Sequence, residues 1–154
     1  MSETIDAIYK KILKLLRGDA RIPNAEIAKK VGMAPSAVLE RIRKLERKGV
    51  IAGYETRIDA ESLGVRLTTL VLIKTNETVG SMDLGDELAK LPEVLAVYCV
   101  AGEFSYLCKV CVKDVREHTG FLVKIGKIPG VIDSQTTLVM KTIKDAISVD
   151  PSAV

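Results

Sequence analysis

The sequence predicts an α+β protein with a three-helix N-terminal domain and a C-terminal domain of order β-α-β-β-α-β. Apolar residues recur at three- and four-residue spacing through the first 52 residues, which indicates amphipathic helices. Beyond residue 53 the pattern changes to β-branched runs that alternate with two further helical segments. A chain of 154 residues, 47% hydrophobic and 28% charged, is long enough for two small globular domains.

The composition also restricts the location of the protein. No apolar run approaches the roughly 20 residues that are needed to cross a bilayer. The N-terminus carries acidic residues and lacks the short apolar core of a signal peptide. Three cysteines, an odd number, agree with a reducing compartment. We therefore expect a cytoplasmic protein with no membrane partner.

Three helices are expected in the first domain. The second covers residues 24–31, with Asn24 as its N-cap, and ends at Gly32. The third has Pro35 in its first turn and ends at Gly49. The residues expected to face inward are Ile5, Ile8, Ile12, Leu15 and Leu16 in the first helix, Ile27, Ala28 and Val31 in the second, and Val38, Ile42 and Leu45 in the third.

The turn between the second and third helices has the pattern of a helix-turn-helix. Ala28 is small where the third helix must cross closely, and Gly32 suits a left-handed backbone conformation. Met33 and Val38 fill the space between the crossed helices. This spacing makes residues 1–52 a candidate DNA-binding domain.

The outward face of the third helix is strongly basic. Residues 1–60 contain 13 Lys/Arg and 8 Asp/Glu, a net charge of +5, and the remainder carries −2. Small residues at the start of the helix would allow close approach to base edges, and the cations would reach bases or phosphates. The alternative is a solvated face partly paired with Glu40 and Glu46. The predicted contacts to double-stranded DNA are Ser36, Ala37, Glu40, Arg41, Arg43, Lys44, Arg47 and Lys48.

The second domain is predicted to form a four-stranded antiparallel sheet with both helices on one face. The expected strands are residues 66–76, 93–102, 104–113 and 130–144, and the expected helices are 82–91 and 115–128. The opposite face has no cover within the chain, although it carries apolar residues. We therefore expect another subunit to cover it.

No set of residues typical of a metal or catalytic site is found. Cys108 and Cys111 resemble a zinc or redox pair, but in a strand their side chains would point to opposite faces. They are interpreted as small buried hydrophobic residues. The single histidine, His118, is interpreted as a solvated helix residue. No catalytic residue, metal ligand or cofactor is therefore predicted.

Three segments together resemble the Lrp/AsnC (leucine-responsive, or feast/famine) family of prokaryotic transcription regulators. They are "ILKLLRGDARIPNAEIAKKVGMAPSAVLERIRKLERKGVIAGYETRID", "LPEVLAVYCVAGEFSYLCKV" and "PGVIDSQTTLVMK". The resemblance implies a helix-turn-helix domain at 1–52, a hinge strand and linker at 53–64, and a ferredoxin-like effector-sensing and oligomerisation domain at 65–154. It also implies dimers through the sheets and assembly into an octamer.

The same resemblance implies an amino acid or related metabolite as effector, bound between dimers. Many relatives have Asp where Ser105 stands, so an ionic contact to an α-ammonium group is missing here. A neutral contact, a different effector and no effector all stay open, as does an ordinary β-turn at Gly102. Ala34 replaces the Ser that caps the third helix in many relatives, at a cost of about 1 kcal/mol. The positions that match the family site are Tyr98, Gly102, Ser105, Tyr106, Gln135 and Thr136.

Two other functions compete with a DNA-binding regulator. Some proteins of similar architecture decarboxylate haem precursors, a chemistry that depends on histidines, and this chain has one. A metabolite-binding oligomer that does not bind DNA is the second alternative. It leaves the charge of the first 60 residues and the turn pattern unexplained, so we predict a sequence-specific regulator without enzymatic activity.

Overall fold

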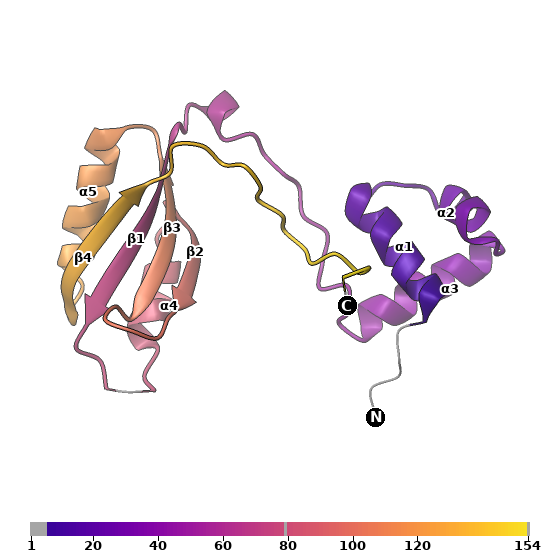
Figure 1. The fold of residues 1–154 in the computed structure, drawn as a ribbon, viewed down its shortest axis with the longest axis horizontal. Helices are drawn as coiled ribbons and strands as arrows, with labels where there is room; N and C mark the ends of the chain where they lie inside the picture. The colour runs from indigo at the N-terminus through magenta and orange to yellow at the C-terminus, as the bar shows by residue number, and fades with distance from the viewer. Residues whose placement is uncertain (1–5, 79, 154) are drawn as a thin grey trace. The chain divides into compact units, whose positions relative to one another are not determined.

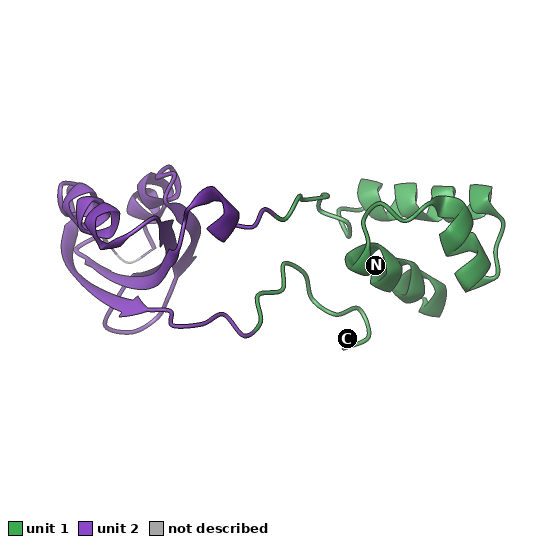
Figure 2. Ribbon diagram, turned by 90° about the horizontal axis from the view of Figure 1, so that it is seen from above, with its two compact units in different colours: residues 1–57, 144–154 green, residues 58–143 purple. Residues whose placement is uncertain are grey.

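A computed structural model of the chain describes residues 6–78 and 80–153 (Figure 1). The chain divides into two compact units, residues 1–57 with 144–154, and residues 58–143 (Figure 2). Residues 144–153 thus belong with the helices, whereas the sequence pattern places them in the second domain. Asp150 of this segment forms an ion pair with Arg17 of the first helix, and Arg57 donates a hydrogen bond to the carbonyl oxygen of Asp145.

The first unit contains the three expected helices, α1 (Ala7–Gly18), α2 (Asn24–Val31) and α3 (Pro35–Arg47). The three predicted inward residues of α3 are buried, and Ile8, Leu15, Leu16 and Val31 pack around the edge of the same core. Ile5 lies outside the described residues. The buried core consists of Ile12, Ile27, Ala28, Val38, Ile42 and Leu45.

The start of α2 differs from the prediction. Pro23, not Asn24, is the N-cap, and no side chain completes the cap. The carbonyl oxygen of Pro23 accepts hydrogen bonds from the amides of Glu26 (2.9 Å) and Ile27 (3.1 Å). Because helical bonding begins there, Asn24 is already inside the first turn and its side chain cannot act as the N-cap.

The linker contains no strand. Residues 52–59 have no regular secondary structure, and a short 3-10 helix, η1 (Glu61–Leu63), follows. The hinge strand expected within 53–64 is therefore not formed in the single chain. A strand needs a partner for its backbone hydrogen bonds, and none of the described segments pairs with these residues.

The second unit has the predicted order, β1 (Leu67–Thr75), α4 (Asp83–Ala89), β2 (Val94–Cys99), β3 (Tyr106–Val112), α5 (Val115–Gly126) and β4 (Val131–Leu138). The antiparallel sheet has the strand order β2-β3-β1-β4 of a ferredoxin-like fold, and both helices lie on one side of it (Figures 1 and 2). The buried core between helices and sheet consists of Val71, Ile73, Leu84, Leu88, Tyr106, Cys108, Val110, Val112, Phe121 and Ile125.

β4 is shorter than expected. It ends at Leu138, opposite Thr69, and the amide of Val139 donates one further bond to the carbonyl oxygen of Thr68 (3.0 Å). β1 begins at Leu67, so the chain beyond Val139 has no strand beside it. Residues 139–144 are consequently irregular, although their β-branched composition is typical of a strand.

The prediction that the two cysteines point to opposite faces is confirmed, whereas the interpretation of His118 is wrong. Cys108 is fully buried on the helical side of the sheet, and Cys111 is half-buried on the other face. His118 is 8% exposed on α5, and its ring stacks near that of Phe121 at a centroid distance of 6.1 Å. Its inward position follows from helical spacing, because Phe121 and Ile125 lie three and seven residues further along the same face.

Candidate functional site

The turn between α2 and α3 has the geometry that its residues predict. Gly32 adopts the left-handed conformation at φ 71°, and the amide of Met33 donates to the carbonyl oxygen of Ala28 (3.1 Å). Ala28 is 3% exposed and Val38 is fully buried at the crossing of the two helices. The turn therefore holds α3 as the second helix of a helix-turn-helix unit.

The predicted DNA contacts are distributed around α3. The side chain of the N-cap residue, Ala34, makes no hydrogen bond to the helix, in agreement with the predicted absence of a cap. Ser36, Glu40, Arg43, Arg47 and Lys48 are exposed, and Ala37, Arg41 and Lys44 are partly exposed.

One outward cation is paired with an acid of the same helix. The guanidinium of Arg47 lies 3.0 Å from Glu40, and the two side chains are 62% and 65% exposed. Exposed pairs of this kind contribute at most about 1 kcal/mol, so the pair can open when a phosphate offers Arg47 a competing anion.

Arg41 does not point into solvent as predicted. Its Nη1 lies 3.0 Å from Oδ2 of Asp6, and its Cζ lies 4.5 Å from the ring centroid of Tyr9. The side chain is 25% exposed and packs on the start of α1. Because the position of Arg41 on α3 is next to the buried Ile42, the long side chain can lie along the neighbouring helix.

Asp6 has two roles in this contact. Its Oδ1 accepts the amide of Tyr9 (2.8 Å) and caps α1, while Oδ2 faces Arg41. The hydrogen bond from Tyr9 and the bond to Arg41 lower the pKa of Asp6 below its ordinary value. Asp6 and Tyr9 were not predicted as functional residues, although an Asp ahead of an apolar helical run is a recognisable N-cap signal.

The candidate effector residues Gly102 and Ser105 lie in the loop between β2 and β3. Gly102 has a φ of 141°, which favours glycine. The amide of Val100 donates to the carbonyl oxygen of Ser105 (2.9 Å), and the amide of Ser105 donates to that of Ile73 (2.9 Å). The hydroxyl of Ser105 accepts a bond from Thr75 (2.9 Å), which holds its side chain at the end of β1.

Tyr106 belongs to the core of the second unit. It is 2% exposed, and its hydroxyl donates to Oε2 of Glu77 (2.8 Å). Burial and the neighbouring Glu77 raise the pKa of Tyr106 to about 12. Burial alone would raise the pKa of Glu77, but bonds from the amide of Leu84 and from Tyr106 and Ser81 outweigh it and lower that pKa. Glu77 lies in a loop without a motif, so its role could not be predicted.

The other candidate effector residues are not brought together within one chain. Tyr98 on β2 and Gln135 on β4 lie on the open face, at opposite edges of the sheet and roughly 14 Å apart. Thr136 faces the helices, where its hydroxyl lies 3.3 Å from Nε2 of His118. A small ligand could contact several of these residues only if two copies of the chain contribute.

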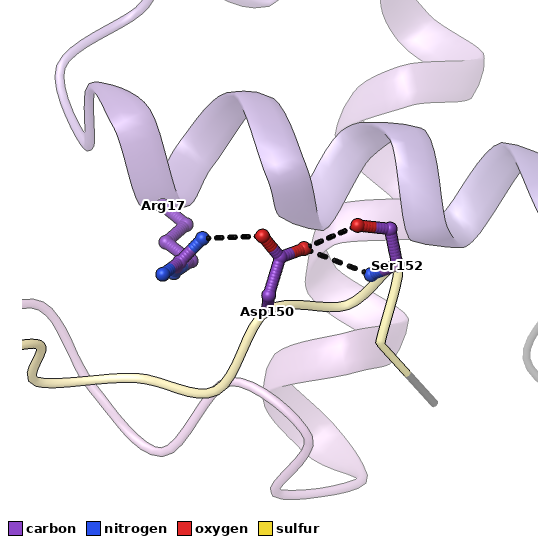
Figure 3. Close-up of polar contacts among 3 residues, drawn as sticks. All are labelled: Arg17, Asp150 and Ser152. Atoms are coloured by element: carbon purple, nitrogen blue, oxygen red, sulfur yellow. Dashed lines mark hydrogen bonds and ion pairs between the residues drawn. The ribbon is translucent and has the colours of Figure 1, made fainter.

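The C-terminal segment is attached to α1 through Asp150 (Figure 3). Its carboxylate lies 3.1 Å from Nη1 of Arg17 and accepts bonds from the hydroxyl (2.6 Å) and amide (2.9 Å) of Ser152. The bonds from Ser152, and then the charges of Arg17 and Lys14, lower the pKa of Asp150 to about 2. Asp150 is therefore ionised at neutral pH and can hold the segment on α1.

Within residues 6–78 and 80–153, no group of His, Cys, Asp and Glu side chains could hold a metal ion. No described helix is long and apolar enough to cross a membrane. What the described residues do provide is a helix-turn-helix unit with a basic second helix, followed by a ferredoxin-like domain. This combination defines the class of DNA-binding regulators that carry a separate sensing domain.

Comparisons with known proteins define the family. Residues 5–52 match the winged helix-turn-helix DNA-binding family, and residues 68–149 match the Lrp/AsnC ligand-binding domain. The HTH-type transcriptional regulator FL11 of Pyrococcus horikoshii is 39% identical, over 94% of this chain and 95% of that protein. The leucine-responsive regulatory protein of Haemophilus influenzae is 35% identical, over 93% and 88%.

Solved structures agree with this result. The feast or famine regulatory protein of Mycobacterium tuberculosis, solved in complex with L-methionine, superposes with a TM-score of 0.88 at 31% identity. The match covers 96% of this chain and 100% of that one. The chain therefore belongs to the Lrp/AsnC family of helix-turn-helix transcription regulators, as its motifs predicted.

Proposed function

We propose that this regulator binds pseudo-palindromic DNA as a dimer, with α3 of each subunit in the major groove. The single observation that carries this proposal is the basic α3, held by the Gly32 turn and followed by a ligand-binding domain of the family. Dimers of this class bind half-sites about one helical turn, roughly 34 Å, apart. The exposed Arg43, Arg47 and Lys48 would neutralise phosphates, and the N-terminal Ser36 and Ala37 would approach bases.

The salt dependence of DNA binding tests the phosphate contacts. Arg43→Ala should weaken binding, and the slope of log affinity against log salt should fall by about 0.9 for each phosphate that the variant no longer neutralises. Lys113→Ala is the matched control, because it removes an exposed cation from the second unit. Equal slopes for the wild type and Arg43→Ala would remove Arg43 from the interface.

We further propose an amino acid as the effector, bound where copies of the chain meet. This is supported by the ligand-binding family match and by the relative that was solved with L-methionine. Tyr98 and Gln135 are exposed, as is Gly102, whose lack of a side chain would let a carboxylate approach the backbone amides of its loop. Tyr106 would support this site from the core, and the exposed Thr136 lies on the helical side of the edge strand, where it is bonded to His118.

A thermal-shift panel of the twenty amino acids tests the effector. A ligand at 100 times its dissociation constant should stabilise the folded protein by about 2.7 kcal/mol, which a melting curve resolves. Gln135→Ala should weaken the response, whereas Lys127→Ala, at the end of α5, should leave it unchanged. No shift with any amino acid would contradict an amino-acid effector while leaving DNA binding to be measured separately.

Assembly and location complete the proposal. The open face of the sheet supports a dimer, and family membership supports further assembly into an octamer that engages several DNA sites. The proposed location is the cytoplasm, and no enzymatic activity is proposed. A haem-precursor decarboxylase is disfavoured because both ring nitrogens of His118 face threonine hydroxyls, of Thr69 (3.5 Å) and Thr136 (3.3 Å), on the helical side of the sheet.

A further inference from the structure

Arg41 lies in the middle of the basic helix α3, yet its side chain is directed to α1. The guanidinium is 3.0 Å from the carboxylate of Asp6 and 4.5 Å from the ring centroid of Tyr9. The other oxygen of Asp6 caps α1 by accepting the amide of Tyr9 at 2.8 Å. One acidic side chain therefore joins the beginning of α1 to the central turn of α3.

We propose that Arg41 is a positioning residue, which fixes α3 on α1 through Asp6 and Tyr9 and makes no contact with DNA. The proposal rests on the DNA-binding function of the family. It separates Arg41 from the exposed cations on and next to α3. Arg43, Arg47 and Lys48 are exposed and can meet phosphates, whereas Arg41 is used within the domain.

Two features of the contact between Arg41, Asp6 and Tyr9 favour a positioning role for Arg41. The positive charge of Arg41 is balanced by Asp6 within ion-pair distance, so the pair contributes little net charge to the DNA-facing surface. The guanidinium also lies over the Tyr9 ring, where the cation and the ring attract each other. A move toward DNA would break both contacts and leave the Asp6 carboxylate without its cation.

Placement of this helix matters for binding. Hydrogen bonds to base edges in the major groove require the reading helix to be held within about 0.5 Å of its correct position. The start of α3 lacks a side-chain cap, so its fixation depends on its packing against α1 and α2. The Asp6–Arg41–Tyr9 contact supplies a polar anchor beside the buried Ile12 and Ile42.

Asp6→Asn separates the two possible roles of Arg41. Asparagine caps a helix about as well as aspartate, so the bond to Tyr9 is kept while the ion pair is removed. If Arg41 contacts DNA, removal of the nearby negative charge should leave binding unchanged or strengthen it. If Arg41 positions α3, the same substitution should weaken binding. Only the positioning role therefore predicts weaker binding.

The experiment uses the full chain and a duplex that the wild-type protein selects from a random DNA library. Dissociation constants are measured by fluorescence anisotropy from about 50 to 200 mM salt, at a temperature where circular dichroism shows every variant to be folded. The variants are Asp6→Asn, Arg41→Met, their combination, and Arg41→Lys. Arg43→Met is the matched control, since it removes the same charge from an exposed neighbour on α3.

We expect Asp6→Asn and Arg41→Met to weaken binding by similar factors, about threefold to tenfold, with an unchanged salt slope. Their combination should be no weaker than either alone, because both remove the same interaction. Arg41→Lys should recover part of the affinity, since an ammonium can still pair with Asp6. In NMR spectra, the ring-current shift of the Arg41 side chain over Tyr9 should diminish in Asp6→Asn.

Two results would overturn the positioning role. One is unchanged or tighter binding by Asp6→Asn, and the other is a salt slope that falls by about 0.9 in Arg41→Met, the change expected when one phosphate is no longer neutralised. Either would place Arg41 on the DNA. If the wild-type protein enriches no duplex at all, DNA binding itself fails, and the positioning role fails with it. That failure is recognised before any variant is compared.

Discussion

Gly85 of α4 packs closely against the ring of Tyr106. A Cβ added there would lie 2.7 Å from Cε1 of Tyr106, whose hydroxyl is bonded to Glu77. Gly85→Ala must therefore displace a buried ring. We expect the unfolding free energy to fall by about 1–3 kcal/mol, as for other overpacked cores, when it is measured by urea denaturation.

Gly120→Ala is the matched control for Gly85→Ala, because Gly120 also lies in a helix but has open space around its Cα. Alanine is favoured over glycine inside helices, so this variant should gain about 0.5–1 kcal/mol. Destabilisation of both variants by the same amount would show that the Tyr106 contact is not the cause.

His118 should make stability depend on pH. Burial lowers the pKa of His118 below 6.5, and its described side-chain contacts, with Thr69, Thr136 and Phe121, are uncharged. Between the two pKa values the unfolded chain binds the proton and the folded chain does not, so stability falls as the pH falls through 6.5. Below the folded pKa this loss levels off.

The measurement is the unfolding free energy of the wild type and of His118→Gln at a series of pH values from about 7.5 to 5.5. Because the sequence contains one histidine, the variant should lose most of the dependence in this range. The comparison concerns the slopes, since the substitution changes the absolute stability as well. Parallel curves would contradict the assignment to His118.

Single residues were predictable only where their role is local. Gly32 and Pro35 were placed correctly, because a left-handed turn and a helix start each favour one residue type. Arg41 was misplaced because its partner Asp6 lies at the start of another helix far along the chain, and His118 was misplaced although its spacing to Phe121 and Ile125 indicates an inward position. Neither Asp6 beside Arg41 nor Thr69 beside His118 can be identified from the spacing of nearby residues.

At the scale of elements, the N-terminus of α3 lacks a stabilising side-chain cap. Ala34 is its N-cap and provides no side-chain oxygen. Ala34→Ser would supply an acceptor for an amide of the first turn and should raise stability by about 1 kcal/mol, measured by thermal denaturation. Ala20→Ser makes the same chemical change in the exposed turn before α2 and should have almost no effect. Equal effects would exclude capping as the cause.

Helices and strands were predictable where the spacing of apolar residues shows which face of the element is buried. The alternating burial of β1 and β3 and the helical spacing of α3 produced the expected order and core. The ends were less predictable, since β4 stops beside the beginning of β1 and the expected hinge strand has no partner among the described segments. The candidate effector residues could be named from the resemblance to the family. Which of them lie on the open face of the sheet and which on the helical side follows only from the strand register.

At the scale of the whole molecule, the proposed dimer depends on the open face of the sheet. Leu72 lies at its centre, with Leu107 on one side and Gln135 on the other. Other residues of this face are Leu70, Ala96 and Tyr98, and both helices of the unit pack on the opposite side. Burial of such a face between two copies would supply the hydrophobic area that one chain leaves exposed.

Leu72→Glu should therefore dissociate the proposed dimer. An unpaired carboxylate buried in the interface would cost at least about 3 kcal/mol, and binding to paired half-sites should fall far more than binding to one half-site. Light scattering should show the wild type as a multiple of 16.7 kDa and the variant at lower mass. Val115→Glu, an exposed site at the start of α5, should change neither. An unchanged mass for Leu72→Glu would place the subunit interface on another surface.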